Sequence, residues 1–310
     1  MRIVFMGTPV FAVPSLQKLL LSEHKVVGVV TQPDRPRGRG QRCTPTPVKV
    51  LAQDAGIPVL TPERLREPAF LSALREWRPD LCTVVAFRIL PKEVLRTPRK
   101  GTVNVHPSLL PKYRGAAPIQ WAIINGERIT GVTTFYIQSA VDAGDILLQR
   151  PVEIGEEETA GELHDRLKEM GADLLLETVD LIESGQARPL PQPTEGVSKA
   201  PKLRKEDARI DWAKPAETIR NLIRGTNPIP GAYTFWRGAM LKIYRGKTLP
   251  DVSASQPGEV LQADQKMGII VAAGQGGLWL SDVQLEGKKR MDSAAFVRGH
   301  RVEVGEVLGE

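Results

Sequence analysis

The sequence predicts an α/β protein: a Rossmann-like, mostly parallel sheet with crossover helices, followed by a small C-terminal β-barrel of the OB type. Three observations support this fold class. Strand-like and helix-like segments alternate over residues 1–185. A proline-rich polar stretch follows. The remaining residues form short strand-like runs separated by glycine and proline.

In the first part of the chain, short runs of β-branched and aliphatic residues predict strands, and helical segments stand between several of them. This alternation favours a parallel sheet in which helices form the crossovers. The expected strands span residues 2–6, 25–31, 81–87, 101–105 and 131–137, and the first two expected helices span residues 14–21 and 47–55.

A longer helix is expected from residue 159 to residue 185. Thr159 followed by Glu162 resembles a capping box, in which each residue bonds the backbone of the other. Apolar residues then repeat at helical spacing as far as Gly185. These residues are Leu163, Leu167, Met170 and Leu174.

The predicted boundaries place the first domain at residues 1–188, a linker at 189–206 and the second domain at 207–310. The linker contains Pro189, Pro191, Pro193 and Pro201 among polar and basic residues. Beyond it, strand-like runs at 240–244, 258–262, 268–272 and 277–285 predict the small barrel.

The composition is that of a globular protein, since 41% of the 310 residues are hydrophobic and 25% are charged. The net charge of +6 indicates an acidic or phosphorylated partner. No N-terminal signal is visible and no stretch approaches the roughly 18 apolar residues of a membrane span, so we expect a cytoplasmic protein. Cys43 and Cys82 form no CxxC pair and only four histidines are present, so no metal is expected.

A basic loop is predicted over residues 34–49. From residue 35 onward it holds five cations and no carboxylate, and its glycines and prolines make regular structure unexpected. Such a loop suits a phosphate backbone, because each engaged cation releases a counterion. A solvated basic loop without a partner is the equally weighted alternative. The cations are Arg35, Arg37, Arg39, Arg42 and Lys49.

The turn Gly7-Thr8-Pro9 between the first strand and helix has the layout of a nucleotide-binding turn. However, the sequence has neither a G-x-G-x-x-G fingerprint nor a G-x-x-x-x-G-K-[ST] loop. The sequence therefore lacks the motifs that would indicate a dinucleotide-binding protein or an NTPase. The turn either connects strand to helix or lends backbone N–H groups to a ligand.

Asn104 and His106 form the strongest candidate site. They are two residues apart at a predicted strand end, so their side chains point to one face. Pro107 ends the strand and places both at the carboxyl edge of the sheet, where α/β folds bind ligands. Asp142 is a second candidate, which either makes a local turn or orients an imidazole.

These residue types favour direct acyl transfer. No G-x-S-x-G elbow is present and neither cysteine has the setting of a nucleophile, which argues against a covalent enzyme intermediate. Direct transfer to an amine needs a donor for the developing oxyanion and a group that handles the amine proton. Asn104 suits the first task and His106 the second.

Five segments follow one another as they do in methionyl-tRNA formyltransferases, and the chain resembles that family over nearly its whole length. The set from Asn104 to Pro111 together with Asp142 marks the wider folate-dependent formyltransferases. The basic loop and the second domain indicate the tRNA-acting branch. The segments span residues 7–15, 31–40, 104–115, 141–145 and 205–212.

The resemblance implies a formyl-transfer site and two ligand sites. The catalytic residues would be Asn104, His106 and Asp142, with 10-formyltetrahydrofolate as donor and the methionyl α-amine of initiator tRNA as acceptor. It further implies that the second domain contacts the same RNA, and we expect the protein to be a monomer. The folate site would include Ser108, Leu109, Leu110 and Pro111, and Arg35, Arg37, Arg39 and Arg42 would reach the acceptor arm of the tRNA.

The chain departs from the family pattern at two places. Phe87-Arg88 stands where Tyr-Gly is usual, which puts a charge near the expected folate pocket, and Gln138 and Ala140 stand where Asp and Gly are common. Three other functions remain open: formyl transfer to a glycinamide ribonucleotide or an amino-sugar nucleotide, hydrolysis of the formyl folate, and RNA binding without catalysis. The arginine-rich loop argues against a sugar-nucleotide acceptor.

Overall fold

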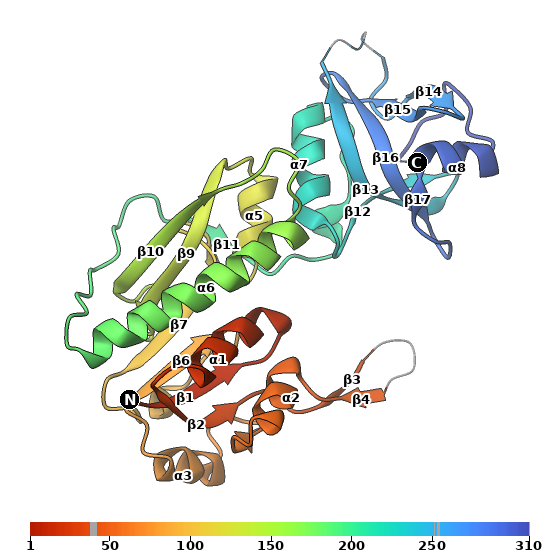
Figure 1. Ribbon diagram of the computed structural model, residues 1–310. Helices are drawn as coiled ribbons and strands as arrows, with labels where there is room; N and C mark the ends of the chain where they lie inside the picture. The colour runs from red at the N-terminus through yellow and green to blue at the C-terminus, as the bar shows by residue number, and fades with distance from the viewer. Residues whose placement is uncertain (38–41, 251, 253–254, 310) are drawn as a thin grey trace. The chain divides into compact units, whose positions relative to one another are not determined.

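A computed structural model describes residues 1–37, 42–250, 252 and 255–309. The chain folds into two compact units (Figure 1). The first unit holds residues 1–118, 129–153 and 164–200, and the second holds residues 119–128, 154–163 and 201–310. No helix in the described ranges has both the length and the apolar character needed to cross a bilayer.

The first unit contains a seven-stranded sheet with the order β10-β9-β7-β6-β1-β2-β5. β9 (Ile129–Tyr136) pairs antiparallel with β7, and β10 (Ile146–Glu153) pairs antiparallel with β9. The other five strands run parallel: β1 (Arg2–Gly7), β2 (Lys25–Val30), β5 (Val59–Leu60), β6 (Leu81–Val85) and β7 (Thr102–His106). The predicted mostly parallel sheet is confirmed.

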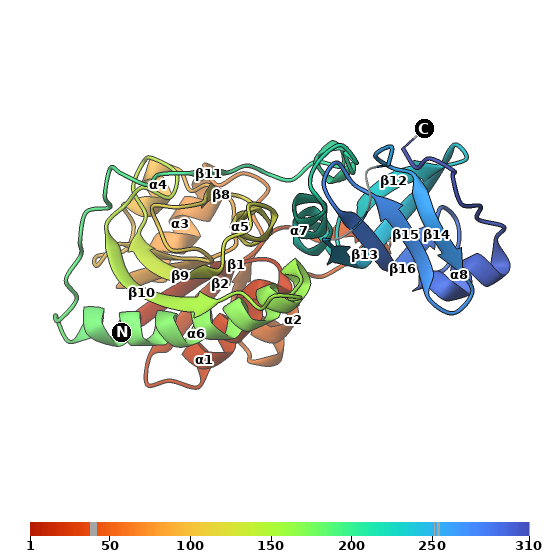
Figure 2. The ribbon, with the colours of Figure 1, turned by 90° about the horizontal axis from the view of Figure 1, so that it is seen from above.

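Helices cover both faces of this sheet (Figure 2), which is why the central strands β1, β2 and β6 are apolar and buried along most of their length. α3 (Pro68–Glu76) and α4 (Lys92–Leu95) lie on one face, in a core shared with Met6 and Val84. α1 (Val13–Leu20) and the part of α6 (Ala160–Glu183) in this unit lie on the other. Gly171 of α6 leaves room for Val105, whose methyl would lie 2.9 Å from an added Cβ.

The predicted capping box at the start of α6 is confirmed. The Thr159 hydroxyl accepts a hydrogen bond from the Glu162 N–H at 3.3 Å, and the Glu162 carboxylate accepts one from the Thr159 N–H at 2.8 Å.

The remaining short helices of this part of the chain are η1 (Val10–Ala12), α2 (Pro47–Asp54) and α5 (Pro118–Ile124).

The expectation of irregular structure across the basic segment is wrong for two stretches. β3 (Arg35–Arg37) and β4 (Arg42–Thr44) pair antiparallel as a hairpin that extends from the sheet (Figure 1). Pro36 is tolerated because a two-stranded ribbon has two free edges, where a missing N–H costs no ladder bond. Arg39 lies outside the described residues.

Residues 190–200, which we call the strap, pair with the first unit at both ends. Leu190 exchanges two backbone hydrogen bonds of 2.8 Å with Ile146 at the start of β10. At the other end β11 (Lys199–Ala200) pairs parallel with β8 (Arg114–Gly115). The predicted domain boundaries themselves stay a prediction.

The second unit has an antiparallel sheet with the strand order β12-β13-β16-β15-β14, and β17 pairs with β16. Within the described residues the two end strands of this sheet, β12 and β14, do not pair with each other. The elements are η2 (Glu206–Ala208), α7 (Ala216–Thr226), β12 (Ala232–Trp236), β13 (Ala239–Leu249), β14 (Val260–Asp264), β15 (Gly268–Ala272), β16 (Gly277–Leu285), β17 (Met291–Asp292) and α8 (Ser293–Gly299).

Two buried arginines of α7 hold residues 154–163 within this unit. Arg220 donates to the Glu156 carbonyl at 2.5 Å and to carboxylates of Glu157 and Glu217. Arg224 donates to the carbonyls of Gly155 and Glu158, each at 3.1 Å. Charged hydrogen bonds to backbone carbonyls are strong, which explains why this segment packs with later sequence.

Candidate active site

The candidate site lies at the carboxyl ends of β6 and β7. The chain order reverses beside β1, since β2 and β5 follow on one side and β6 and β7 on the other. Ligands of such sheets bind at this switch point. Asn104 pairs with Val84 of β6, and Val84 belongs to the core under α3 and α4. Asn104 and His106 therefore point to that face of the sheet.

His106 is buried, with 4% of its surface exposed, and both ring nitrogens have a neighbour. Nε2 lies 2.9 Å from the carbonyl oxygen of Tyr113. A carbonyl can only accept, so Nε2 carries the hydrogen. In the neutral ring Nδ1 then holds a lone pair, and it lies 3.8 Å from a carboxylate oxygen of Asp142.

Burial lowers the pKa of His106 below its ordinary value of 6.5, while the Asp142 charge and the Tyr113 carbonyl oppose this shift. The ring is therefore neutral at pH 7, with Nδ1 able to accept a proton. A proton taken up there would lie next to the Asp142 carboxylate, which stabilises the cation.

Asp142 is held by a contact far away in sequence. One carboxylate oxygen accepts a hydrogen bond from the Gly115 N–H at 2.8 Å. Its backbone is left-handed, with φ +50°. The structure thus brings Asp142 to His106, which the sequence could not decide, and the carboxylate does more than cap its own turn.

Asn104 has a half-buried side chain. Within the described parts of the chain, no group forms a hydrogen bond with its carboxamide. Polar groups that are partly buried normally find a partner. An amide without one beside His106 is suited to a ligand.

The segment from Ser108 to Pro111 forms a tight loop after β7. Ser108 is fully buried and its hydroxyl donates to the Lys112 carbonyl at 2.7 Å. Thr133 of β9 donates to the Ser108 carbonyl at 2.6 Å and accepts from the Leu110 N–H at 3.1 Å. These bonds fix the loop's backbone, so its surface toward a ligand is preformed.

The Gly7 turn also lies at this edge. A Cβ on Gly7 would come within 2.8 Å of both Ala12 Cβ and the Phe5 ring. Close packing therefore requires glycine there. This requirement supports the structural role of the turn and leaves its use by a ligand a prediction.

Arg88 follows β6, where the sequence departs from the family pattern. Its guanidinium donates to the carbonyls of Glu63 at 2.9 Å and Pro62 at 2.8 Å. It thus ties the loop after β5 to the loop after β6. Whether it touches the folate stays a prediction.

Arg88→Ala is expected to lower the free energy of unfolding by about 1.5 to 3 kcal/mol, because two charge-assisted hydrogen bonds are lost. Urea denaturation measures this change. Arg99→Ala is the control, since the Arg99 side chain is 74% exposed and lies 3.9 Å from Asp80. Equal stability of the two variants would contradict a role for Arg88 in holding the loop.

Three of the predicted RNA-binding arginines, Arg35, Arg37 and Arg42, are in the strands of the hairpin. Arg35 pairs with Thr44, and Arg37 pairs with Arg42. The Arg35 side chain is 67% exposed and lies 3.8 Å from the Glu63 carboxylate. A weak surface pair of this kind leaves the guanidinium available for another anion.

Two residues of this region, Gln192 and Ser198, were not singled out by the sequence, whereas Tyr113 and Gly115 belong to the segment 104–115 without an assigned role. Gly115 carried a signal, as the glycine that follows a basic and aromatic triplet. Gln192 and Ser198 carried none, because they lie in a polar stretch that reads as a linker. Their hydrogen bonds join segments far apart in sequence and exist only in the folded chain.

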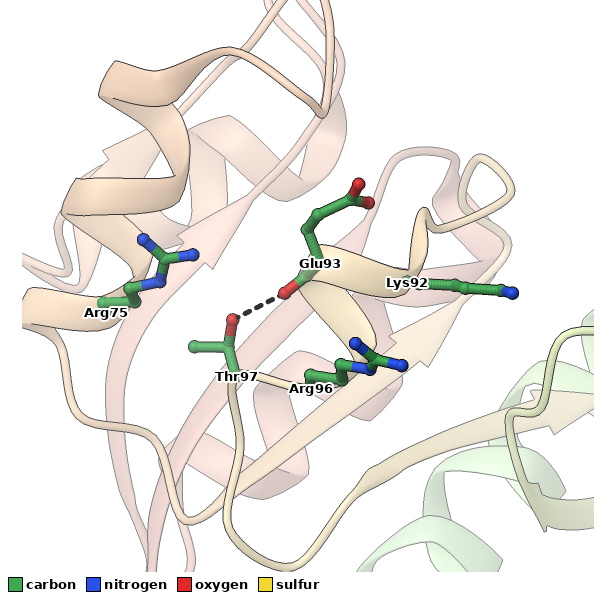
Figure 3. A pocket seen from close by; sticks show the side chains of 5 residues that line it. All are labelled: Arg75, Lys92, Glu93, Arg96 and Thr97. Atoms are coloured by element: carbon green, nitrogen blue, oxygen red, sulfur yellow. Dashed lines mark hydrogen bonds between the residues drawn. The ribbon is translucent and has the colours of Figure 1, made fainter.

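A separate cavity of about 520 Å³ lies between α3 and α4 (Figure 3). It is lined by Arg75, Lys92, Glu93, Arg96 and Thr97, and the Thr97 hydroxyl donates to the Glu93 carbonyl at 3.1 Å. The long side chains around it are exposed and solvated. Asn104, His106 and Asp142 are not among its lining residues, so this cavity is separate from the candidate site.

The formyl transferase family model matches residues 1–179, and the model of the formyl transferase C-terminal domain matches residues 202–301. The chain belongs to the formyl transferase family. Methionyl-tRNA formyltransferase from Syntrophus aciditrophicus is 51% identical, with 99% of this chain and 98% of the relative covered. The same-named protein from Citrifermentans bemidjiense is 49% identical, with 100% of this chain and 97% of the relative covered.

Among solved structures, the fold is similar to that of WlaRD, a sugar 3N-formyl transferase crystallised with dTDP and 5-N-formyl-THF. The TM-score is 0.68 at 21% identity, with 93% of this chain and 99% of that chain covered. At this identity the likeness shows the fold alone. Because 93% of this chain is covered, the similarity of fold extends over parts of both units.

Proposed function

We propose that the protein transfers the formyl group of 10-formyltetrahydrofolate to the α-amino group of methionyl initiator tRNA, which then serves translation initiation. One observation carries this proposal. His106 faces Asp142 beside Asn104, whose carboxamide has no hydrogen-bond partner among the described residues. These residues stand in a chain about half identical over its full length to methionyl-tRNA formyltransferases. The 21% identity to the sugar transferase makes that acceptor the weaker candidate.

The proposed chemistry assigns one task to each side chain. When bound, the folate supplies an activated formyl carbonyl. The Asn104 amide donates a hydrogen bond to the carbonyl oxygen as negative charge develops there. His106 Nδ1 accepts the proton that the amine releases, and Asp142 stabilises the imidazolium that results. The bond between the formyl carbon and the folate nitrogen then breaks, and the imidazolium gives its proton to that nitrogen.

The donor would lie against the loop from Ser108 to Pro111 and the loop after β6. Two large apolar side chains bordering this edge are exposed, Ile89 by 79% and Val141 by 55%. An aromatic ring system covering them would remove apolar surface from water. The preformed backbone of the Ser108 loop supports the same placement.

The tRNA would be held by the β3–β4 hairpin and by the domain from residue 207 onward, with formyl transfer assigned to residues 1–188 and the linker to 189–206. We further propose that the protein acts as a monomer in the cytoplasm. The exposed Arg35 and the concentration of cations in the hairpin support the RNA contact.

Neutralising the hairpin by changing Arg35, Arg37, Arg39 and Arg42 to Gln is expected to weaken tRNA binding and flatten its salt dependence. Each lost phosphate contact should reduce the slope of log affinity against log salt by about one. Filter binding of initiator tRNA over a range of salt concentrations measures this slope.

Arg35→Gln and Arg99→Gln form a matched pair, because each removes one exposed guanidinium and Arg99 lies before β7, at the opposite edge of the sheet. Only the first should reduce the slope. An unchanged slope in the fourfold variant would remove the hairpin from the RNA interface.

The function itself is tested by a formyl-transfer assay with the folate donor and different acceptors. We expect formylated initiator methionyl-tRNA and little formate release without tRNA. Product with an amino-sugar nucleotide or a glycinamide ribonucleotide would indicate the related transferases, formate without acceptor a hydrolase, and tRNA binding without product a noncatalytic protein.

A further inference from the structure

We propose that Gln192 and Ser198 of the strap are positioning residues that hold the two groups facing the ring nitrogens of His106. The strap runs from the end of α6 past β10 to β11 (Figure 1). This inference deepens the proposed function and rests on it for its catalytic consequence. Its structural content concerns His106 and its neighbours alone.

Gln192 fixes the loop that carries Asp142. Its amide nitrogen donates to the carbonyls of Asp142 at 2.9 Å and Gly144 at 2.8 Å. Its amide oxygen accepts from Arg114 at 2.6 Å and 3.1 Å. The amide orientation follows from chemistry, because a guanidinium only donates and a carbonyl only accepts. The side chain thereby joins the Asp142 loop to the segment after Tyr113.

Ser198 holds Tyr113, the residue whose carbonyl faces the other ring nitrogen. Its hydroxyl accepts from the Tyr113 N–H at 2.8 Å. Tyr113 in turn presents its carbonyl to His106 Nε2 at 2.9 Å. The neighbouring residue is also held, since the Arg114 N–H donates to the Ser198 carbonyl at 2.9 Å.

The backbone of the held residues explains why tethers are needed. Tyr113 has φ +60° and Asp142 has φ +50°, and neither is glycine. L-residues leave this left-handed region unless surrounding contacts hold them there. The strap bonds the N–H of Tyr113 and the carbonyl of Asp142, the same two residues whose other groups face the imidazole.

Close packing keeps the strap in register with the site. A Cβ on Gly115 would come within 2.4 Å of the Ala200 carbonyl oxygen. That oxygen accepts from the N–H groups of Ala116 and Ala117 at 2.8 Å and 3.2 Å. Gly115 is also the residue whose N–H binds the Asp142 carboxylate. The strap, the β8 segment and Asp142 therefore form one bonded assembly.

The test uses three variants of the full chain. Gln192→Leu removes all polar contacts of the side chain, Gln192→Glu keeps an acceptor for Arg114 but loses both donors, and Ser198→Ala removes the acceptor for Tyr113. Thr194→Val is the control, because Thr194 is an exposed residue of the same strap. Two readouts are taken: the titration of the His106 ring by NMR, and turnover with the Michaelis constants of both substrates.

We expect turnover to fall by about 10- to 100-fold in the three variants, because small misplacement of reacting groups is costly. Michaelis constants should stay within about threefold, since no substrate contact is removed. In Gln192→Leu and Ser198→Ala the pKa of His106 should fall, because both the Asp142 charge and the Tyr113 carbonyl raise it in the native site. Gln192→Glu also introduces a negative charge, so its readout is turnover. The control should leave all three quantities unchanged.

Three results would overturn the proposal: an unshifted His106 titration in the folded Ser198→Ala or Gln192→Leu protein, a change confined to the Michaelis constant for tRNA, or a loss of turnover in Gln192→Leu that is absent from Gln192→Glu. The third result would assign the loss of turnover to the broken contact with Arg114. Because the NMR titration needs no tRNA, it stands apart from the proposed function, whose failure appears instead as absent formyl transfer in the wild type.

Discussion

His106→Ala should lower the turnover of formyl transfer by about 10²- to 10⁴-fold, the usual contribution of a positioned general base. The variant loses Nδ1, the lone pair that faces Asp142, and with it the acceptor for the amine proton. Binding of initiator tRNA should change little, since the ring is buried and accounts for little of the accessible surface. Single-turnover formylation and filter binding measure the two quantities.

His164→Ala is the matched control. Its ring is partly exposed on α6, bonds Asp165 at 3.3 Å and packs against Phe11. We expect it to retain nearly full turnover. Wild-type turnover in His106→Ala would remove the imidazole from the chemistry and leave Asn104 as the main contributor.

Asp142→Asn should lower turnover by on the order of 10²-fold or more, because the charge that stabilises the imidazolium disappears while the shape of the side chain is kept. The amide oxygen can still accept from Gly115, so the loop should stay in place. The loss of turnover therefore measures the effect of the Asp142 charge and not the effect of a displaced side chain.

The pH dependence of this variant has a definite sign. In the native site the Asp142 charge raises the pKa of His106, although burial holds it below 6.5. Removing the charge lowers that pKa further, so the acid limb of the rate profile should move to lower pH as turnover at neutral pH falls. NMR titration of His106 separates this shift from the titration of the substrate amine, which also lies near neutrality.

Asp145→Asn is the control for Asp142, since Asp145 lies on the same loop and bonds Tyr136 through its backbone carbonyl. The double variant His106→Ala with Asp142→Asn gives a second check. If the two residues act as a unit, it should be little slower than His106→Ala alone. Fully additive losses would show that Asp142 acts on the reaction independently of the imidazole.

Five strands of the first unit's sheet, β1, β2, β6, β7 and β9, were predictable because each is a short run rich in β-branched and aliphatic residues. The helix from Thr159 was equally clear, since its capping box and its periodic leucines agree. The hairpin was missed because Pro36 and the glycines around it suppress the strand signal, while a free edge makes proline harmless there. The strands β5 and β10 and the helices α3, α4 and α5 were not predicted. α7 and the short helix α8 were missed as well.

The candidate site was partly predictable for a local reason. Asn104 and His106 share a face because strand residues two apart always do, and a proline after His106 marks the edge of the sheet. The contact between Asp142 and His106 depends on the path of the loop after β9. No local sequence pattern encodes that path, so from the sequence alone Asp142 could equally have formed a simple turn.

By itself, then, the sequence determined the family, the fold class, and the placement of Asn104 and His106 on one strand face. Only the tertiary structure decided what faces each nitrogen of the imidazole and what holds those groups. Tyr113 is held through its N–H by Ser198, 85 residues later, and the Asp142 loop is held by Gln192, 50 residues later. Periodicity and turn chemistry act over a few residues, whereas contacts across such separations exist only once the sheet and the strap have packed.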